Sequence, residues 1–187
     1  MEGRFRVVIR LLCISLLLVF AVGCASTVPK PQFIKEIAPE SCIAGQDQTQ
    51  VNVESGKDVS MIDAEKLRFA EKVKLKIDAY KAAKTRSGSA KSFDVDLVIT
   101  RYDKGNAFAR SMLAGLGQIH VDGEVSVYEL PDRNMVGQFT ISKTFAWGGI
   151  YGAITSIEDI ETTFAEGVAA ALTGQPEQVR RSSKKAE

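Results

Sequence analysis

The sequence predicts an α+β fold of two layers, in which an antiparallel sheet with a central hairpin carries two helices on one face. Two segments, 61–85 and 157–173, repeat apolar side chains at steps of three or four, which is the spacing of a helix face. Three other segments alternate apolar and polar side chains, as half-buried strands do. A short polar turn joins two of these alternating segments, so they form a hairpin.

The first predicted helix covers 61–85. Ser60 followed by Asp63 matches a capping box, and Gly88 lies just beyond a basic last turn. Its lysines alternate with the apolar stripe and are expected to be solvated. The predicted apolar stripe consists of Leu67, Ala70, Val73, Ile77 and Tyr80.

Three predicted strands follow the first helix. The segment 92–102 alternates, and 119–130 and 135–145 alternate in the same way on either side of the turn residues 131–134. Because each strand has one apolar face, the sheet is expected to bury one side only. Shorter strands are predicted nearer the N-terminus, at 33–37 and 51–53.

The second predicted helix starts after Ser156, which forms a capping box with Asp159, and stops at Gly174 and Pro176. The polar, basic segment 175–187 is expected to be a disordered tail. The apolar stripe of this helix consists of Ile157, Ile160, Phe164, Val168 and Ala171.

Residues 1–23 have the pattern of a secretory signal peptide, with basic residues before a short apolar run and small residues at its end. The apolar run, 11–22, is shorter than the roughly 20 residues that span a bilayer as a helix. The following Ala21-Val22-Gly23-Cys24 resembles the lipobox of bacterial lipoproteins. That resemblance implies cleavage before Cys24 and attachment of fatty-acyl chains, such as palmitate, to its thiol.

The acyl chains are the predicted membrane anchor, since each buried methylene contributes about 0.8 kcal/mol and more than one chain gives stable attachment. Residues 24–32 are then a lipidated tether and 33–174 a single domain. Ala25 and Ser26 lack the aspartate that, in lipoproteins, retains the protein at the inner membrane, which favours the outer membrane facing the periplasm. The alternative is an ordinary secreted protein in which Cys24 is unmodified.

The composition excludes some functions. The formal net charge is +1, and removal of the basic signal peptide leaves the chain close to neutral, which argues against non-specific nucleic-acid binding. Cys13 leaves with the signal peptide and Cys24 is acylated, so Cys42 remains alone. It is expected to be buried or to lie in a loop without function, and the alternatives are transient oxidation or a bridge between two chains.

Two glycine-rich apolar loops, 111–117 and 147–155, are the least ordinary part of the sequence. They flank the hairpin, so antiparallel pairing would bring them to the same end of the sheet. We hypothesise that they form one apolar surface that binds an envelope protein, another copy of this chain or lipid. The alternative is that both loops fold inward over the core. The candidate partner-binding residues are Leu113, Leu116, Trp147, Ile150 and Tyr151, with Met112 beside them.

A catalytic or metal site is not expected. His120, Asp122 and Glu124 share one strand face, but side chains two apart begin roughly 6.5–7 Å from one another, too far to converge easily on one ion. A solvated strand face explains them and the pair Asp94 and Asp96 equally well. His120 is the only histidine, and no nucleophile motif accompanies it. We therefore predict no metal, no cofactor and no enzymatic activity.

Several short runs resemble a family of small bacterial lipoproteins, known only as a domain of unknown function, number forty-four ten. They are ITRY at 99–102, AFAR and LAGLG within 107–117, HVDGEVSVYE from His120, and KTFAWGGIYG from Lys143. The resemblance covers roughly residues 60–172 and implies an envelope location and this fold, with no activity or site residues. The sequence thus predicts a non-catalytic binding or assembly module. The alternatives are a lipid-handling accessory of an envelope transport system and, less favoured, a metal-dependent enzyme.

Overall fold

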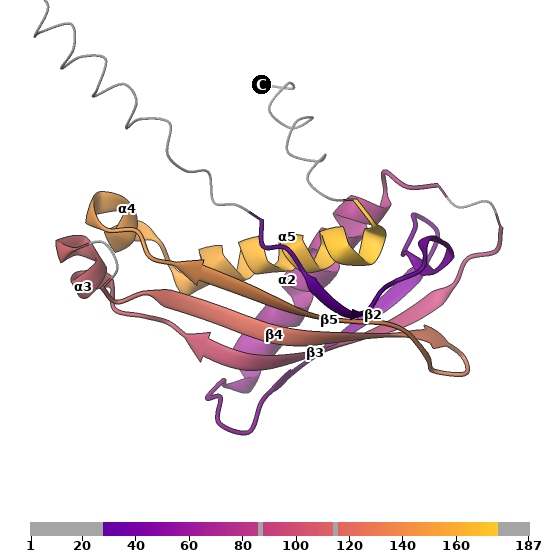
Figure 1. The fold of residues 1–187 in the computed structure, drawn as a ribbon, viewed down its shortest axis with the longest axis horizontal. Helices are drawn as coiled ribbons and strands as arrows, with labels where there is room; N and C mark the ends of the chain where they lie inside the picture. Colours follow the sequence, from indigo (N-terminus) through magenta and orange to yellow (C-terminus); the bar gives the residue numbers. More distant parts are fainter. Residues whose placement is uncertain (1–27, 86–87, 114–115, 176–187) are drawn as a thin grey trace, which may run out of the picture.

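The computed structural model of the protein describes residues 28–85, 88–113 and 116–175. The predicted signal peptide 1–23, the predicted lipidation residue Cys24 and the predicted tail from residue 176 onward lie outside the described residues. Within the described part, a sheet and two long helices form two layers (Figure 1). The predicted α+β class is confirmed.

The sheet has five strands in the order β1-β5-β4-β3-β2. The predicted hairpin is confirmed as β4 and β5 at its centre, with Val125 opposite Phe139. β1 and β3 pair antiparallel with the two sides of this hairpin. The strand bounds are β1 Gln32–Lys35, β2 Gln48–Ser55, β3 Ser92–Asp103, β4 Ile119–Leu130 and β5 Asn134–Phe145.

The edge strand β2 departs from the otherwise antiparallel arrangement, because it runs parallel to β3 with Val51 opposite Val95. The connection between the two strands is the helix α2, Asp63–Lys81. A helix that crosses over the sheet returns the chain to the end where the previous strand began, so the next strand runs parallel to it.

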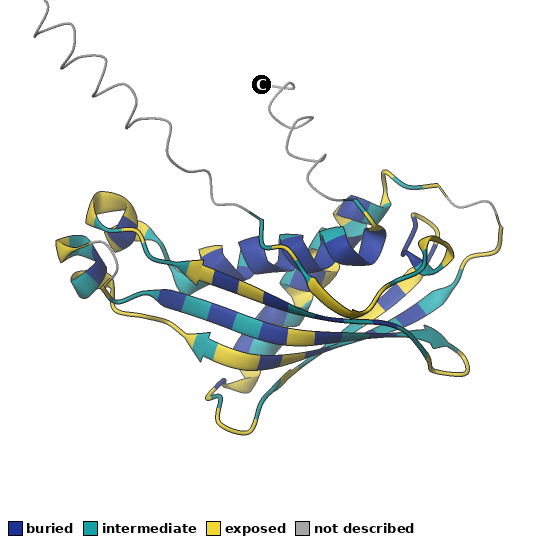
Figure 2. Cartoon of the chain, in the orientation of Figure 1, coloured by how far each residue is buried: buried dark blue, intermediate teal, exposed yellow. Residues whose placement is uncertain are grey.

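Helix α2 and helix α5, Ile157–Thr173, lie side by side over one face of the sheet (Figure 1). Buried and exposed positions alternate along the central strands (Figure 2). The buried ones include Val95, Leu97 and Val125. The rings of Phe69 and Phe164 meet edge to face, with centroids 5.4 Å apart, and join the two helices. The opposite face of the sheet carries the polar side chains, as predicted.

The details of α2 differ from the prediction. The predicted capping box of Ser60 with Asp63 is wrong: the helix begins at Asp63, and Glu65 accepts a hydrogen bond from the backbone nitrogen of Ile62 at 3.1 Å. Leu67, placed in the predicted stripe, is exposed, whereas Phe69 is fully buried. Val73, Ile77 and Tyr80 of the predicted stripe are buried, so the buried face departs from the prediction only in the first part of the helix.

Helix α5 agrees closely with the prediction. The Ser156 hydroxyl accepts a hydrogen bond from the backbone of Asp159, whose carboxylate in turn accepts one from the Ser156 backbone. The helix ends before Gly174, as predicted, and Gly174 has a left-handed conformation with φ 63°. Phe164 and Val168 of the predicted stripe are fully buried. The remaining cysteine, Cys42, is buried as well, in agreement with the first of the expected alternatives.

A cluster of polar groups around the buried Glu161 joins α2, α5 and β3. We call it the Glu161 cluster, and it comprises Glu161, Arg68, Lys72 and Tyr102. The Glu161 carboxylate is 0% exposed. It accepts hydrogen bonds from Arg68 Nη2 and Lys72 Nζ, both at 2.7 Å, and from the Tyr102 hydroxyl at 2.6 Å. Burial alone would raise the pKa of Glu161, but the donors, Arg68 first among them, outweigh burial and lower it.

Candidate partner-binding site

Two short helices lie together at one end of the sheet (Figure 1). Helix α3, Ala107–Met112, follows β3, and helix α4, Gly149–Ile154, follows β5. The predicted loops 111–117 and 147–155 therefore contain helical turns, which the sequence analysis missed. Because β3 and β5 both run toward this end of the sheet, the segments after them meet, as the sequence analysis expected.

Arg110 holds the two short helices together. Its side chain lies between them and the residue is only 3% exposed. Its guanidinium donates to three backbone carbonyl oxygens: Nε to Gly152 at 2.8 Å, Nη1 to Gly117 at 2.8 Å and Nη2 to Thr155 at 2.9 Å. A planar guanidinium has several N–H donors in a fixed geometry, so it can donate hydrogen bonds to carbonyl oxygens of separate segments at once. Arg110 thus fixes α4 and the segment before β4 relative to α3.

Two glycines allow this close approach. Gly117 has φ +59°, and a Cβ there would collide with the carbonyl oxygen of Asn106. At Gly152, a Cβ would collide with the carbonyl oxygen of Trp147 and would lie 2.9 Å from the carbonyl oxygen of Arg110. Both positions therefore require glycine if the segments are to keep their hydrogen bonds.

The two short helices and the residues that flank them carry a group of exposed apolar side chains, which we call the apolar patch. Ile150, Phe108 and Tyr151 are 81%, 75% and 74% exposed. Most of α4 is exposed in Figure 2, in contrast to the buried face of α5. The full set comprises Phe108, Met112, Leu113, Leu116, Trp147, Ile150, Tyr151 and Ile154.

The patch has almost no charge of its own. Residues 146–157 include no lysine, arginine, aspartate or glutamate, and within 105–119 the single such residue is the buried Arg110. A concentration of large exposed apolar side chains at one end of a fold is typical of a surface that contacts a partner or a membrane. The hydrogen bonds of Arg110 also hold the backbone beneath the patch in place. Binding a partner therefore costs less conformational entropy than it would on a mobile loop.

The structure exposes all five residues predicted to bind a partner, and it brings them to one end of the sheet. The alternative, in which both loops fold inward over the core, does not describe these side chains. Sequence reasoning missed Phe108 and Ile154. A signal for Phe108 exists, because Phe108 and Met112 are four residues apart, as on a helix face, but a single such pair is too weak to predict a helix.

The other candidates do not form a site. His120 lies on the polar face of the sheet, where its Nδ1 is 3.0 Å from the hydroxyl of Thr144. Among residues 28–85, 88–113 and 116–175, no group of three histidine, cysteine, aspartate or glutamate side chains is placed to hold a metal. Asp94 and Asp96 both pair with Arg133, at 3.2 and 2.6 Å, so they are partners of a cation on the open sheet face.

Within the same described ranges, every helix is too short or too polar to cross a bilayer.

Two solved structures of PelC share the fold. A variant of PelC from Paraburkholderia phytofirmans, a dodecamer, is 12% identical, with a TM-score of 0.53 over 80% of this chain and 99% of that one. A second PelC dodecamer from the same organism is 10% identical, with a TM-score of 0.50 over 78% and 98%. A candidate lipoprotein from Caulobacter crescentus is 16% identical, covering 72% and 91%, with a TM-score of 0.37.

No curated protein is significantly similar to the chain. A family model, however, matches residues 30–149, which hold all the strands of the sheet and the residues that carry most of the apolar patch. The match begins earlier in the chain than the resemblance seen in the sequence and ends before α5. It confirms that the protein belongs to the family described as Domain of unknown function (DUF4410).

Proposed function

We propose that the protein is a lipid-anchored lipoprotein of the cell envelope that acts, without catalysis, as a binding and assembly module. The observation that carries this proposal is the apolar patch: large exposed apolar side chains on and beside two short helices that Arg110 fixes in place. Its partner is an envelope protein, or a second copy of the chain, that covers the patch.

The composition of the patch favours binding to a protein over other uses of the surface. The centres of protein–protein interfaces are enriched in aromatic side chains and methionine and depleted of charge, which is the composition observed here. Trp147 and Tyr151 offer large contact areas with few rotatable bonds and are suited to be the main anchors. The PelC structures are dodecamers, a property of that protein, so self-association is the first form of assembly to measure.

The lipid anchor supplies the location. Acyl chains on Cys24 would hold the domain beside a bilayer, and the absence of aspartate at residues 25 and 26 favours the outer membrane, facing the periplasm. Intact-mass measurement of the protein from its native host tests this assignment. We expect a chain that begins at Cys24 and carries added acyl mass. A chain that retains residues 1–23, or an unmodified thiol, would refute the anchor.

Affinity capture from crosslinked envelope membranes tests the binding role. The wild-type protein is compared with a double variant, Leu116→Asp and Ile150→Asp, in which two charges are placed on the patch. We expect a defined protein partner, or a crosslinked oligomer, that is lost from the variant while the melting temperature is unchanged. Equal capture by both proteins would refute the role of the patch.

A further inference from the structure

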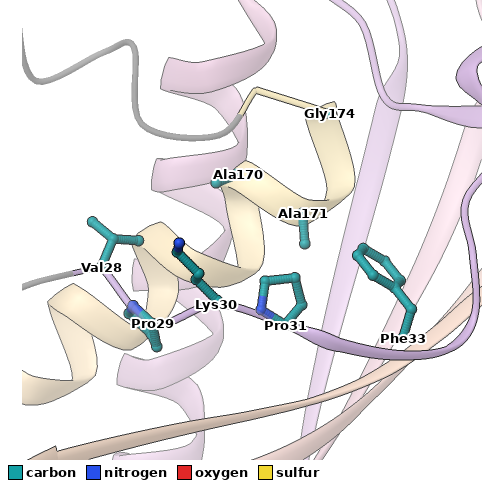
Figure 3. Close-up of a pocket in the computed structure, with 8 residues that line it drawn as sticks. All are labelled: Val28, Pro29, Lys30, Pro31, Phe33, Ala170, Ala171 and Gly174. Atoms are coloured by element: carbon teal, nitrogen blue, oxygen red, sulfur yellow. The ribbon is translucent and has the colours of Figure 1, made fainter.

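An apolar pocket of about 390 Å³ lies between α5 and the segment that leads into β1 (Figure 3). Its volume lies in the lower part of the range for ligand pockets, roughly 300–1,000 Å³. Pro29, Pro31 and Phe33 form one wall, and Ala170, Ala171 and Gly174 of α5 form the other. Apart from the ammonium group of Lys30, the side chains that line it are apolar.

Both walls of the pocket are fixed by packing. Pro29 lies against Gly167 of α5, where an added Cβ would come within 2.8 Å of the proline ring and of its carbonyl oxygen. At the other end, the ring of Phe33 contacts that of Phe139 on β5, with centroids 5.3 Å apart. The small side chains of α5 leave the space between these two anchors unfilled.

The pocket lies close in sequence to the proposed lipidation residue. Val28, which lines it, follows Cys24 by four residues, and such a segment spans at most about 14 Å when extended. A fatty-acyl chain on Cys24 is therefore within reach of the pocket. The C-terminal segment 176–187 also starts nearby, after Gly174, but it is rich in arginine, lysine and serine and suits an apolar pocket poorly.

We infer that this pocket binds a fatty-acyl chain carried by Cys24 of the same molecule. This inference rests on the lipid anchor of the proposed function. The pocket is partly open, so it removes part of an acyl chain from water and recovers part of the burial free energy that the chain has in a bilayer. A chain in the pocket would hold the domain close to the bilayer surface that contains the other acyl chains.

Photocrosslinking of the full-length protein tests the inference. Bacteria that process lipoproteins are supplied with a fatty acid that carries a diazirine near its methyl end, and membranes are irradiated before digestion and mass spectrometry. We expect links between the acylated Cys24 peptide and peptides that contain Phe33 or Ala171. A crosslinked pair that contains the Cys24 peptide shows that the bound chain is the one attached to Cys24. A free fatty acid in the pocket would give a pocket peptide without the Cys24 peptide.

A pair of variants provides the control. Ala170→Phe places a ring in the pocket, whereas Ala79→Phe adds the same side chain to an exposed position of α2, outside the pocket. We expect Ala170→Phe to lower the yield of these links by about tenfold, because lost contact with a couple of methylene groups is enough for that change. Ala79→Phe should leave the yield unchanged.

Three results would overturn the inference. In the first, the acyl chain of Cys24 is linked only to membrane lipids. In the second, the α5 peptides carry a free fatty acid and no Cys24 peptide. In the third, Cys24 carries no acyl label; this result would also refute the proposed anchor, whereas the first two leave the anchor intact.

Discussion

The Glu161 cluster and the apolar patch reverse the usual placement of residue types. In the cluster, a carboxylate is completely buried, whereas in the patch Ile150 is 81% exposed. The cluster is closed, since Arg68, Lys72 and Tyr102 surround Glu161 with hydrogen bonds. The patch is open: its backbone is held from below by Arg110, and the exposed surfaces of its apolar side chains face solvent in the isolated chain.

This difference indicates that the cluster stabilises the fold, whereas the patch serves binding. A buried carboxylate with a full set of donors is explained by the fold itself, because it joins α2, α5 and β3. Exposed apolar side chains do not stabilise the isolated domain, so their presence is explained by a partner that covers them. Changes to the cluster should therefore alter stability, and changes to the patch should alter binding alone.

The largest expected effect is on the cluster. Glu161→Ala removes the acceptor shared by Arg68 and Lys72, and we expect the free energy of unfolding to fall by about 3 kcal/mol, the lower end for a broken buried ion pair, since both cations still reach water. Urea denaturation measures this change. In the matched control, Glu166→Ala, the pair with Lys76 is partly exposed, and the loss should stay below about 1 kcal/mol. Equal losses would refute the distinction.

A smaller, local effect is expected at Arg110. Arg110→Met leaves the carbonyl oxygens of Gly117, Gly152 and Thr155 without their donors, and buried unpaired acceptors are costly. We expect the protection of α3 and α4 against hydrogen exchange to fall by about 2 kcal/mol while α2 and α5 keep theirs. Unchanged protection in α3 and α4 would show that Arg110 does not hold the patch.

Acidic pH should weaken the cluster. The pKa of Glu161 is lowered in the folded protein relative to its ordinary value of 4.5 in the unfolded chain. Its contribution to stability is therefore complete above pH 4.5 and is lost as the pH falls through the lower, folded-state pKa. Urea unfolding from about pH 7 to about pH 3 should show a smaller loss for Glu161→Gln than for wild type. Parallel curves would contradict this.

The smallest effect on stability is expected in the patch. Ile150→Asp changes an exposed side chain, so the free energy of unfolding should change by no more than about 0.5 kcal/mol. Leu75→Asp, at an exposed leucine of α2, is the matched control. Both variants should melt like wild type, and only Ile150→Asp should lose the partner. A marked loss of stability in Ile150→Asp would place that side chain in the core.

The sequence predicted the parts of the molecule that local patterns determine. Ser156 and Gly174 cap helix α5 as expected, because a capping box and a terminal glycine act within a few residues. The place of Phe69 in the core was missed, since apolar side chains lie on two sides of α2, and the side that is buried depends on packing against other elements, such as Phe164 of α5. Periodicity alone does not contain that information.

The sequence predicted five residues of the candidate site, but it did not predict the short helices or the hydrogen bonds of Arg110 that position them. The glycines and apolar side chains of the two loops indicated a surface at one end of the sheet. The role of Arg110 depends on hydrogen bonds to Gly152 and Thr155, more than forty residues away in the chain, for which the sequence carries no local signal. Helices α3 and α4 were missed because six residues are too few for a clear period.

The most direct test of the account is site-specific photocrosslinking in envelope membranes. A photoreactive amino acid replaces Ile150 in one protein and Leu75 in another; both side chains are exposed and apolar, but only the first lies in the patch. We predict a discrete protein adduct, with another protein or a second copy of the chain, from position 150 and none from position 75. Adducts with lipid alone from position 150, or equal protein adducts from both positions, would contradict the account.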